Sequence, residues 1–157
     1  MQGHSPAAAT GHRTRSARRR SREFAMQGIY QWLLSGEDVG AIQAHIEASP
    51  GFELADRSHF ETLLKGAIGK SAELDNALLP SLDRPLNQLS PVERAILMLA
   101  TFELMNLQEI PYRVVINEAV ELAKNFGGTD GYKYVNGVLD RIAPAIRTTE
   151  ARPQKAG

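Results

Sequence analysis

The sequence predicts an all-α protein, a compact bundle of about six or seven helices behind a flexible basic N-terminal arm. Apolar residues recur along most of the chain at the i, i+3, i+4, i+7 spacing of one helix face. Strong β-forming residues are scarce by comparison. With 157 residues, 43% of them hydrophobic and 23% charged, the chain has the size and composition of one globular domain. We place this domain at residues 18–147 and a frayed tail at 148–157.

The N-terminal arm and the first helix share a run of arginines. Residues 1–17 hold little that could be buried, so we expect them to be disordered in the free protein. The first helix begins in the arginine run and ends near Ser35 and Gly36. The run itself is expected to be partly helical, as an extension that orders on a ligand. The buried stripe of this helix consists of Met26, Ile29, Tyr30 and Leu33.

Two helices follow in the next part of the chain. A short amphipathic helix is predicted over 38–48, ended by the Ser-Pro-Gly sequence after it. Asp56 then opens a longer helix that continues to about Leu78, although Gly66 and Gly69 weaken it locally.

The next helix has a complete start signal. Ser90 is a good N-cap, Pro91 suits the first helical position, and Glu93 is spaced to reach back as a capping box. Residues 95–100 are apolar almost all round, which predicts a helix in the centre of the bundle.

Residues 110–143 are predicted to form two helices joined by a glycine corner. Gly127 and Gly128 stop the first helix, and Thr129 or Asp130 can cap the second. The Asn-Gly dipeptide at 136–137 is also a β-hairpin signal. The apolar stripe that continues past it favours a helix, in which Gly137 would be a site of close helix approach.

The net charge of zero hides an asymmetry. Residues 1–22 carry six arginines and no acid, which leaves 12 Lys and Arg against 18 Asp and Glu in 23–157. A basic arm of +6 on a body of −6 indicates a polyanionic partner held by the arm, although a solvated tail that aids solubility has the same composition. The absence of cysteine excludes disulfides and thiol chemistry and fits a cytoplasmic protein, and no targeting or membrane-spanning segment is predicted.

Catalysis is poorly supported by the residue pattern. The four histidines lie singly and lack metal-ligand spacing, so neither a metal site nor a cofactor is predicted. The glycine-rich segment 127–131 could cradle a phosphate, but it lacks a P-loop lysine and a preceding strand, which favours a plain turn between helices. Glu118 and Glu121 could form a carboxylate pair, yet such residues more often belong to a solvated face.

Nucleic-acid binding has better support. Arginines neutralise phosphates without regard to sequence, and exposed aromatic rings stack on the bases of single strands. The candidate rings are Tyr30 in the first helix and Tyr132 and Tyr134, which flank Lys133 at the start of the last helix. From spacing alone, each tyrosine is more often a core residue whose hydroxyl reaches the surface.

Three long segments resemble the NusB family of bacterial transcription antitermination factors. They are RRRSREFAMQGIYQW, LSPVERAILMLATFEL, and IPYRVVINEAVELAKNFG followed by KYVNGVLDRIA. The resemblance extends from about Arg18 to about Ile146. It implies an all-helical, non-enzymatic protein that pairs with NusE, a ribosomal protein of the small subunit. Together they would bind boxA RNA and support processive transcription of ribosomal RNA genes, within an elongating RNA polymerase complex that contains other Nus factors.

The resemblance also implies which residues form the site. The RNA-binding residues carried over are Arg18, Arg19, Arg20, Arg22, Tyr30, Lys133 and Tyr134. The residues expected to face the protein partner are Glu93, Tyr30 and Asp130. Some members of the family form homodimers, and the sequence leaves this possibility open.

Three positions, in two places, depart from the family pattern. Tyr134 stands where the family usually has Phe, and Gly131 and Tyr132 stand where it commonly has Ser and His. Contacts at the start of the last helix could therefore differ.

Two other functions remain as alternatives. A NusB-like domain also occurs in a ribosomal RNA cytosine methyltransferase, but that enzyme needs a second domain and a nucleophilic cysteine, and neither is found in this sequence. The other alternative is a helical module that binds protein only.

Overall fold

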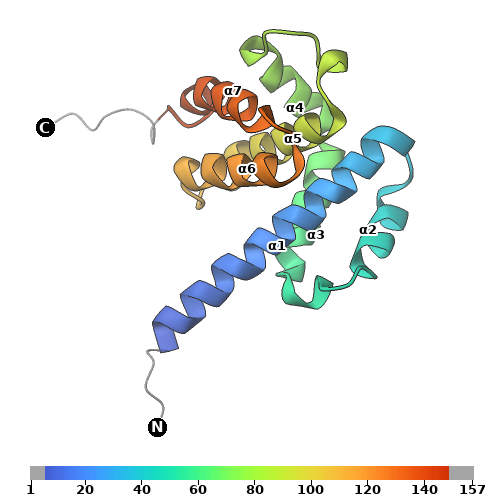
Figure 1. Cartoon of the computed structure of the whole chain (residues 1–157), viewed down its shortest axis with the longest axis vertical. Helices are drawn as coiled ribbons and strands as arrows, with labels where there is room; N and C mark the ends of the chain where they lie inside the picture. The colour runs from blue at the N-terminus through green and yellow to red at the C-terminus, as the bar shows by residue number, and fades with distance from the viewer. Residues whose placement is uncertain (1–5, 149–157) are drawn as a thin grey trace, which may run out of the picture.

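The computed structural model describes the backbone of residues 6–148 and the side chains of residues 16–148, and this part of the chain consists of helices joined by short loops (Figure 1). No strand occurs within it. The seven α-helices are α1 Pro6–Ser35, α2 Val39–Glu47, α3 Arg57–Gly69, α4 Ser71–Leu78, α5 Pro91–Asn106, α6 Tyr112–Phe126 and α7 Gly131–Ile146. Three short 3-10 helices lie between them, at Phe52–Leu54, Leu79–Ser81 and Leu86–Gln88. The predicted fold class, an all-α bundle of six or seven helices, is confirmed.

Helix α5 is the centre of the bundle, as its sequence predicts. Ten consecutive residues, 95–104, are buried. Helices α1, α3, α4, α6 and α7 all pack against it. The Ser90 hydroxyl accepts a hydrogen bond of 3.1 Å from the Glu93 backbone N–H, so the predicted N-cap is present.

The first helix starts earlier than its sequence predicts. Helix α1 begins at Pro6 instead of in the arginine run, because Pro fits the first turn of a helix and the alanines that follow are the best helix formers. Residues 1–5 of the expected disordered arm lie outside the described residues. The predicted end is confirmed, since α1 stops at Ser35 and Gly36 has a φ of 68°.

The long helix predicted from Asp56 is two helices. Helix α3 ends at Gly69 and α4 begins at Ser71, with Lys70 between them at φ −109°. Gly69 lowers the helix propensity at this point, and the break lets both halves cover α5. The expected single stripe is nevertheless buried on both sides of the break, at Phe60, Leu64, Ala67, Leu74 and Leu78.

Helices α6 and α7 form the predicted hairpin, and Asn136 and Gly137 lie inside α7, which excludes the β-hairpin interpretation. Gly128 has a φ of 79° in the turn between the two helices. The expectation for Gly137 is wrong. A Cβ there would meet only the Arg141 side chain of the same helix, at 3.6 Å, because the buried stripe of α7 runs along another face.

The close helix contacts lie at other glycines. A Cβ at Gly28 would lie 2.6 Å from Leu64 Cδ1, and one at Gly66 would overlap the Phe102 ring. These two glycines let α1 approach α3 and let α3 approach α5.

Arg147, the last residue of the predicted domain, anchors the end of the chain to the bundle. Its side chain is 3% exposed and donates to the backbone carbonyls of Leu104, Ile110, Glu103 and Leu107 at 2.6–3.1 Å. These carbonyls end α5 and lead into α6, so Arg147 closes the C-terminus of the central helix. Of the predicted tail, 149–157 lie outside the described residues.

Candidate nucleic-acid interface

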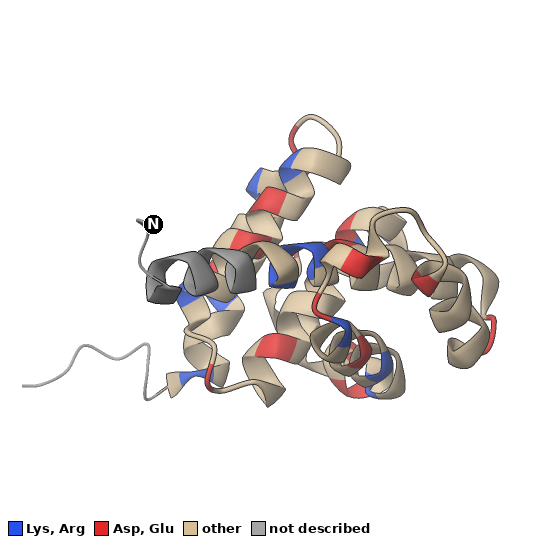
Figure 2. Cartoon of the chain, turned by 90° about the horizontal axis from the view of Figure 1, so that it is seen from below, with Lys and Arg blue, Asp and Glu red and all other residues tan. Residues whose placement is uncertain are grey.

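The arginine run occupies one segment of α1, which is blue in Figure 2. Arg19 is half exposed and makes a two-point contact with Glu118 of α6, with Nε–Oε1 at 3.1 Å and Nη2–Oε2 at 2.8 Å. This contact raises the pKa of the Arg19 guanidinium. Arg18 lies 3.8 Å from the Asp56 carboxylate, and the Arg20 side chain is exposed. Three arginines therefore present positive charge beside α6 and the start of α3.

Arg22 does not belong to this exposed group. It is 5% exposed, and its Nε and Nη2 atoms lie 2.9–3.2 Å from the carboxylate oxygens of Glu103 on α5. Burial raises the pKa of the Glu103 carboxyl, and the Arg22 charge opposes this shift. In this structure Arg22 is a buried link between α1 and α5 instead of a group that an RNA phosphate can reach.

The sequence contained a signal for this role. Glu103 is an acid within the apolar stretch of α5, and a buried carboxylate needs a charged partner. Arg19 and Arg22 are three residues apart and share the helix face that meets α5 and α6, whereas Arg20 points elsewhere.

Tyr30 lies near the C-terminal end of α1 and is 36% exposed. It follows Arg19 by eleven residues, which places it about 16 Å further along the helix axis and close to the same helical face. The expectation that Tyr30 belongs to the buried stripe is thus only partly met, because its neighbours Met26 and Ile29 are buried and its own ring reaches solvent.

The start of α7 gathers four of the predicted residues. Lys133 and Asp130 are exposed and lie 3.4 Å apart, and Asp130 makes no capping bond to the helix. The Glu93 carboxylate lies against Gly131, where a Cβ would be 3.1 Å from Oε2. Glu93 therefore faces the start of α7, and Gly131 leaves the space that this carboxylate occupies.

Tyr134 has one ring face covered by an arginine. The guanidinium carbon of Arg84, in the loop before α5, lies 4.3 Å from the ring centroid. The hydroxyl is buried close to Asp83 without a well-aligned hydrogen bond. Burial raises the pKa of this hydroxyl, and the negative charge of Asp83 adds to the shift. The ring is half-buried and positioned by its surroundings.

Some residues of this surface were not singled out from the sequence. Phe126, the last residue of α6, is 42% exposed directly before the turn that leads to α7. Arg84 lies in the loop before α5, where no sequence motif indicates a binding residue. A detectable signal existed for Phe126 alone, since an aromatic residue beside a glycine corner often reaches solvent.

Seven of the nine predicted residues thus form two groups on the molecule, and Arg22 and Tyr30 belong to neither. The arginine group, Arg18, Arg19 and Arg20, lies on α1, and the α7-start group comprises Glu93, Asp130, Lys133 and Tyr134. Helix α6 connects them, because its Glu118 binds Arg19 and its C-terminal end, about 12 Å further along, leads into the turn before α7.

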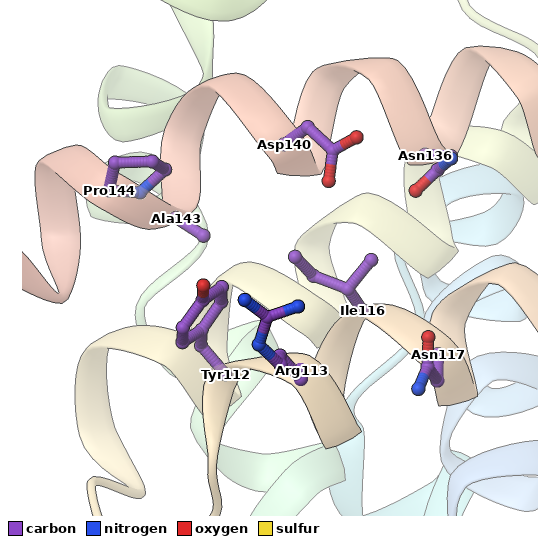
Figure 3. Close-up of a pocket in the computed structure, with 8 residues that line it drawn as sticks. All are labelled: Tyr112, Arg113, Ile116, Asn117, Asn136, Asp140, Ala143 and Pro144. Atoms are coloured by element: carbon purple, nitrogen blue, oxygen red, sulfur yellow. The ribbon is translucent and has the colours of Figure 1, made fainter. Parts of the chain in front are cut away.

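A groove of about 290 Å³ lies between α6 and α7 (Figure 3). Arg113 of α6 and Asp140 of α7 point toward one another across it. None of the predicted RNA- or partner-binding residues lines it. It extends from Tyr112 and Pro144, at the end of the hairpin away from Tyr134, to Asn117 and Asn136 near the middle.

Other kinds of site find no support in the described residues. Within them, no three His, Asp or Glu side chains are grouped to hold a metal ion. None of the helices between residues 6 and 148 has the length and hydropathy to cross a lipid bilayer.

Comparison with known proteins identifies the family. The NusB family model matches residues 19–144. The transcription antitermination protein NusB of Cupriavidus pinatubonensis is 54% identical over 155 residues, which are 98% of this chain and 93% of the relative. The protein of the same name from Paraburkholderia phytofirmans is 59% identical over 138 residues, covering 88% of this chain and 96% of the relative.

Solved structures agree with this assignment. NusB of T. maritima superposes with a TM-score of 0.71 at 35% identity, over 80% of this chain and 89% of that one. A chain from a crystal structure of antitermination factors NusB and NusE in complex with dsRNA gives a TM-score of 0.74 at 27% identity, over 81% and 96% of the two chains. The chain described here therefore belongs to the NusB family.

Proposed function

We propose that this protein is an RNA-binding transcription antitermination factor that pairs with NusE and binds boxA RNA. The function is scaffolding and involves no catalytic step. Family membership supports this proposal, as does the similarity to a chain in a complex of NusB, NusE and dsRNA. The single observation from the structure that carries it is the grouping of exposed cations and aromatic rings on α1 and at the start of α7.

The arginine group and the aromatic residues have separate tasks in this proposal. Arg18, Arg19 and Arg20 attract the RNA backbone through charge, which is independent of sequence. Tyr30, Lys133 and Tyr134 contact the strand itself, and ring stacking supplies part of the preference for boxA. Arg22, proposed from the resemblance as an RNA contact, acts instead by holding α1 in place through Glu103.

The partner side is proposed at the α5–α7 corner and at the C-terminal end of α1, where Tyr30 lies. Glu93, Asp130 and Tyr30 would face NusE, so that RNA and protein bind adjoining surfaces and each stabilises the docking of the other. The complex would act in the cytoplasm with the elongating RNA polymerase and other Nus factors, in the transcription of ribosomal RNA genes. A homodimer of the free protein would compete with these partners if it covered the same surface.

A filter-binding titration with boxA RNA, with and without NusE, tests this function. We expect binding to boxA to be tighter than to a scrambled RNA of equal length, and tighter still when NusE is present. Equal binding of the two RNAs under both conditions would contradict the proposal. Binding to NusE alone would favour the protein-binding module instead.

A further inference from the structure

Arg84 lies where the proposed RNA side and partner side meet. It belongs to the loop between α4 and α5, and its guanidinium carbon is 4.3 Å from the centroid of the Tyr134 ring. The negative charge of Glu93 also acts on it. No motif marks this position in the sequence, and its place beside Tyr134 is visible only in the folded chain.

The Asp83 carboxylate pairs with one edge of the Arg84 guanidinium. Arg84 Nε lies 2.8 Å from Asp83 Oδ1, and Nη2 lies 3.4 Å from Oδ2. The Arg84 side chain is 41% exposed and that of Asp83 is 62% exposed. Solvent therefore screens this pair strongly, and an incoming anion can replace the carboxylate at little cost.

We propose, resting on the proposed function, that Arg84 is a further RNA-binding residue, which exchanges the Asp83 carboxylate for a phosphate group of the RNA strand bound at Tyr134. A planar guanidinium offers a phosphate the same two-point edge that it now offers Asp83. The Tyr134 ring keeps the guanidinium plane in position, so little side-chain entropy is lost on binding. Asp83 is then a competitor that weakens RNA binding by occupying this edge and by repelling the strand.

Variants of the full chain in a filter-binding assay with boxA RNA, at salt concentrations from about 50 to 200 mM, test the proposal. Arg84→Ala is expected to weaken binding about tenfold, as for the loss of a charge-assisted hydrogen bond. It should also make the slope of log K against log salt less steep by about 0.7, the value for one contact to a single strand. Arg84→Lys should restore the slope but only part of the affinity, because lysine keeps the charge and loses the planar edge.

Asp83→Asn tests the competition. It is expected to tighten binding several-fold, and most of this gain should disappear in the Arg84→Ala background if Asp83 acts through Arg84. Arg113→Ala is the matched control, because Arg113 also lies over a tyrosine ring, that of Tyr112 at 5.4 Å, but at the other end of the α6–α7 hairpin. Arg113→Ala should keep the affinity for boxA within twofold of wild type and leave the slope of log K against log salt unchanged.

Wild-type affinity and slope in both Arg84→Ala and Arg84→Lys, with wild-type protein binding boxA normally, would overturn the inference and leave the proposed function intact. An unchanged affinity in Asp83→Asn would overturn the competition. Failure of the wild-type protein to bind boxA would instead remove the proposed function. Thermal melting of each variant checks the fold, and if Arg84→Ala is unstable the Arg84→Lys and Asp83→Asn results decide.

Discussion

At the scale of single residues, the buried pair of Arg22 and Glu103 shows that the arginines of the run have different roles. Four arginines that look equivalent in sequence divide into two exposed cations, Arg19 and Arg20, one partly exposed cation, Arg18, and one buried structural link. A charge that is 5% exposed and held by three contacts to a buried carboxylate cannot leave it for a phosphate without leaving Glu103 unpaired.

Arg22→Ala is therefore expected to lower the free energy of unfolding by about 3–5 kcal/mol, because it leaves the Glu103 charge buried without a partner. Urea denaturation at pH 7 measures this. The double variant Arg22→Met with Glu103→Leu should recover most of the loss, since an apolar pair of similar volume needs no partner. An Arg22→Ala protein of wild-type stability with weakened RNA binding would contradict this structural role and indicate that Arg22 contacts RNA.

His59 makes stability depend on pH. It is 7% exposed, and burial together with the charges of Arg22 and Arg18 lowers its pKa to about 4 from 6.5. Below pH 6.5 His59 binds a proton in the unfolded chain but stays neutral in the folded protein. The free energy of unfolding therefore falls as the pH drops from 6.5 toward 4. Between pH 7 and pH 5 this loss amounts to about 2 kcal/mol.

Urea denaturation of His59→Gln at both pH values checks the origin of the loss. This variant should lose about 2 kcal/mol less than wild type between pH 7 and pH 5, because glutamine does not titrate. His45→Gln, at an exposed position on α2, is the control for replacing a histidine by glutamine. Identical pH profiles for His59→Gln and wild type would show that other groups cause the dependence.

At the scale of the helices, α3 carries two glycines in opposite situations. A Cβ at Gly66 would overlap the Phe102 ring of α5, whereas one at Gly69 would meet nothing within 4 Å. Gly66→Ala should therefore destabilise the protein by about 1–3 kcal/mol through overpacking. Gly69→Ala should stabilise it by about 0.5–1 kcal/mol through higher helix propensity and a less flexible unfolded chain. Thermal melts that rank the two variants in the reverse order would contradict the α3–α5 contact.

Helix positions follow well from the sequence where local signals agree. The cap at Ser90, the apolar run in α5 and the stripe through Ile142 all fix their helices without reference to distant residues. The break at Lys70 could not be predicted as firmly, because it depends on how α3 and α4 each pack against α5.

The candidate site follows from the sequence less completely than the helices do. The resemblance supplied its residues, but only packing separates Arg22 from its neighbours and places Arg84 against Tyr134. Arg147 gave no local signal either, since its role is to donate to carbonyls 37–44 residues away. Contacts between residues distant in sequence are what sequence patterns omit.

At the scale of the whole molecule, charge is distributed so that one end of α1 is positive on an otherwise acidic body. Replacing Arg18, Arg19 and Arg20 by Ala should weaken RNA binding and make the salt slope less steep by about 2, at about 0.7 for each lost contact. Affinity for boxA and for scrambled RNA should fall by similar factors, because this attraction is independent of sequence. A slope equal to that of wild type would exclude the arginine group from the interface.

In the proposed function, the preference for boxA depends on the start of α7, and we expect the Tyr134 ring to be the main contact with the RNA bases there. Tyr134→Phe keeps the ring and removes only a buried hydroxyl without a well-aligned partner, so it should bind boxA as wild type does or slightly better. It is the matched control for removal of the ring.

The most direct measurement is the ratio of affinities for boxA and scrambled RNA in wild type, Tyr134→Phe and Tyr134→Ala, each with NusE present. If the start of α7 reads the strand by stacking, Tyr134→Ala should lower boxA affinity by a factor of about 5–100, the loss of one stacked base. The ratio should then fall toward one, while Tyr134→Phe retains it. Equal losses on both RNAs, or no loss on either, would contradict the account.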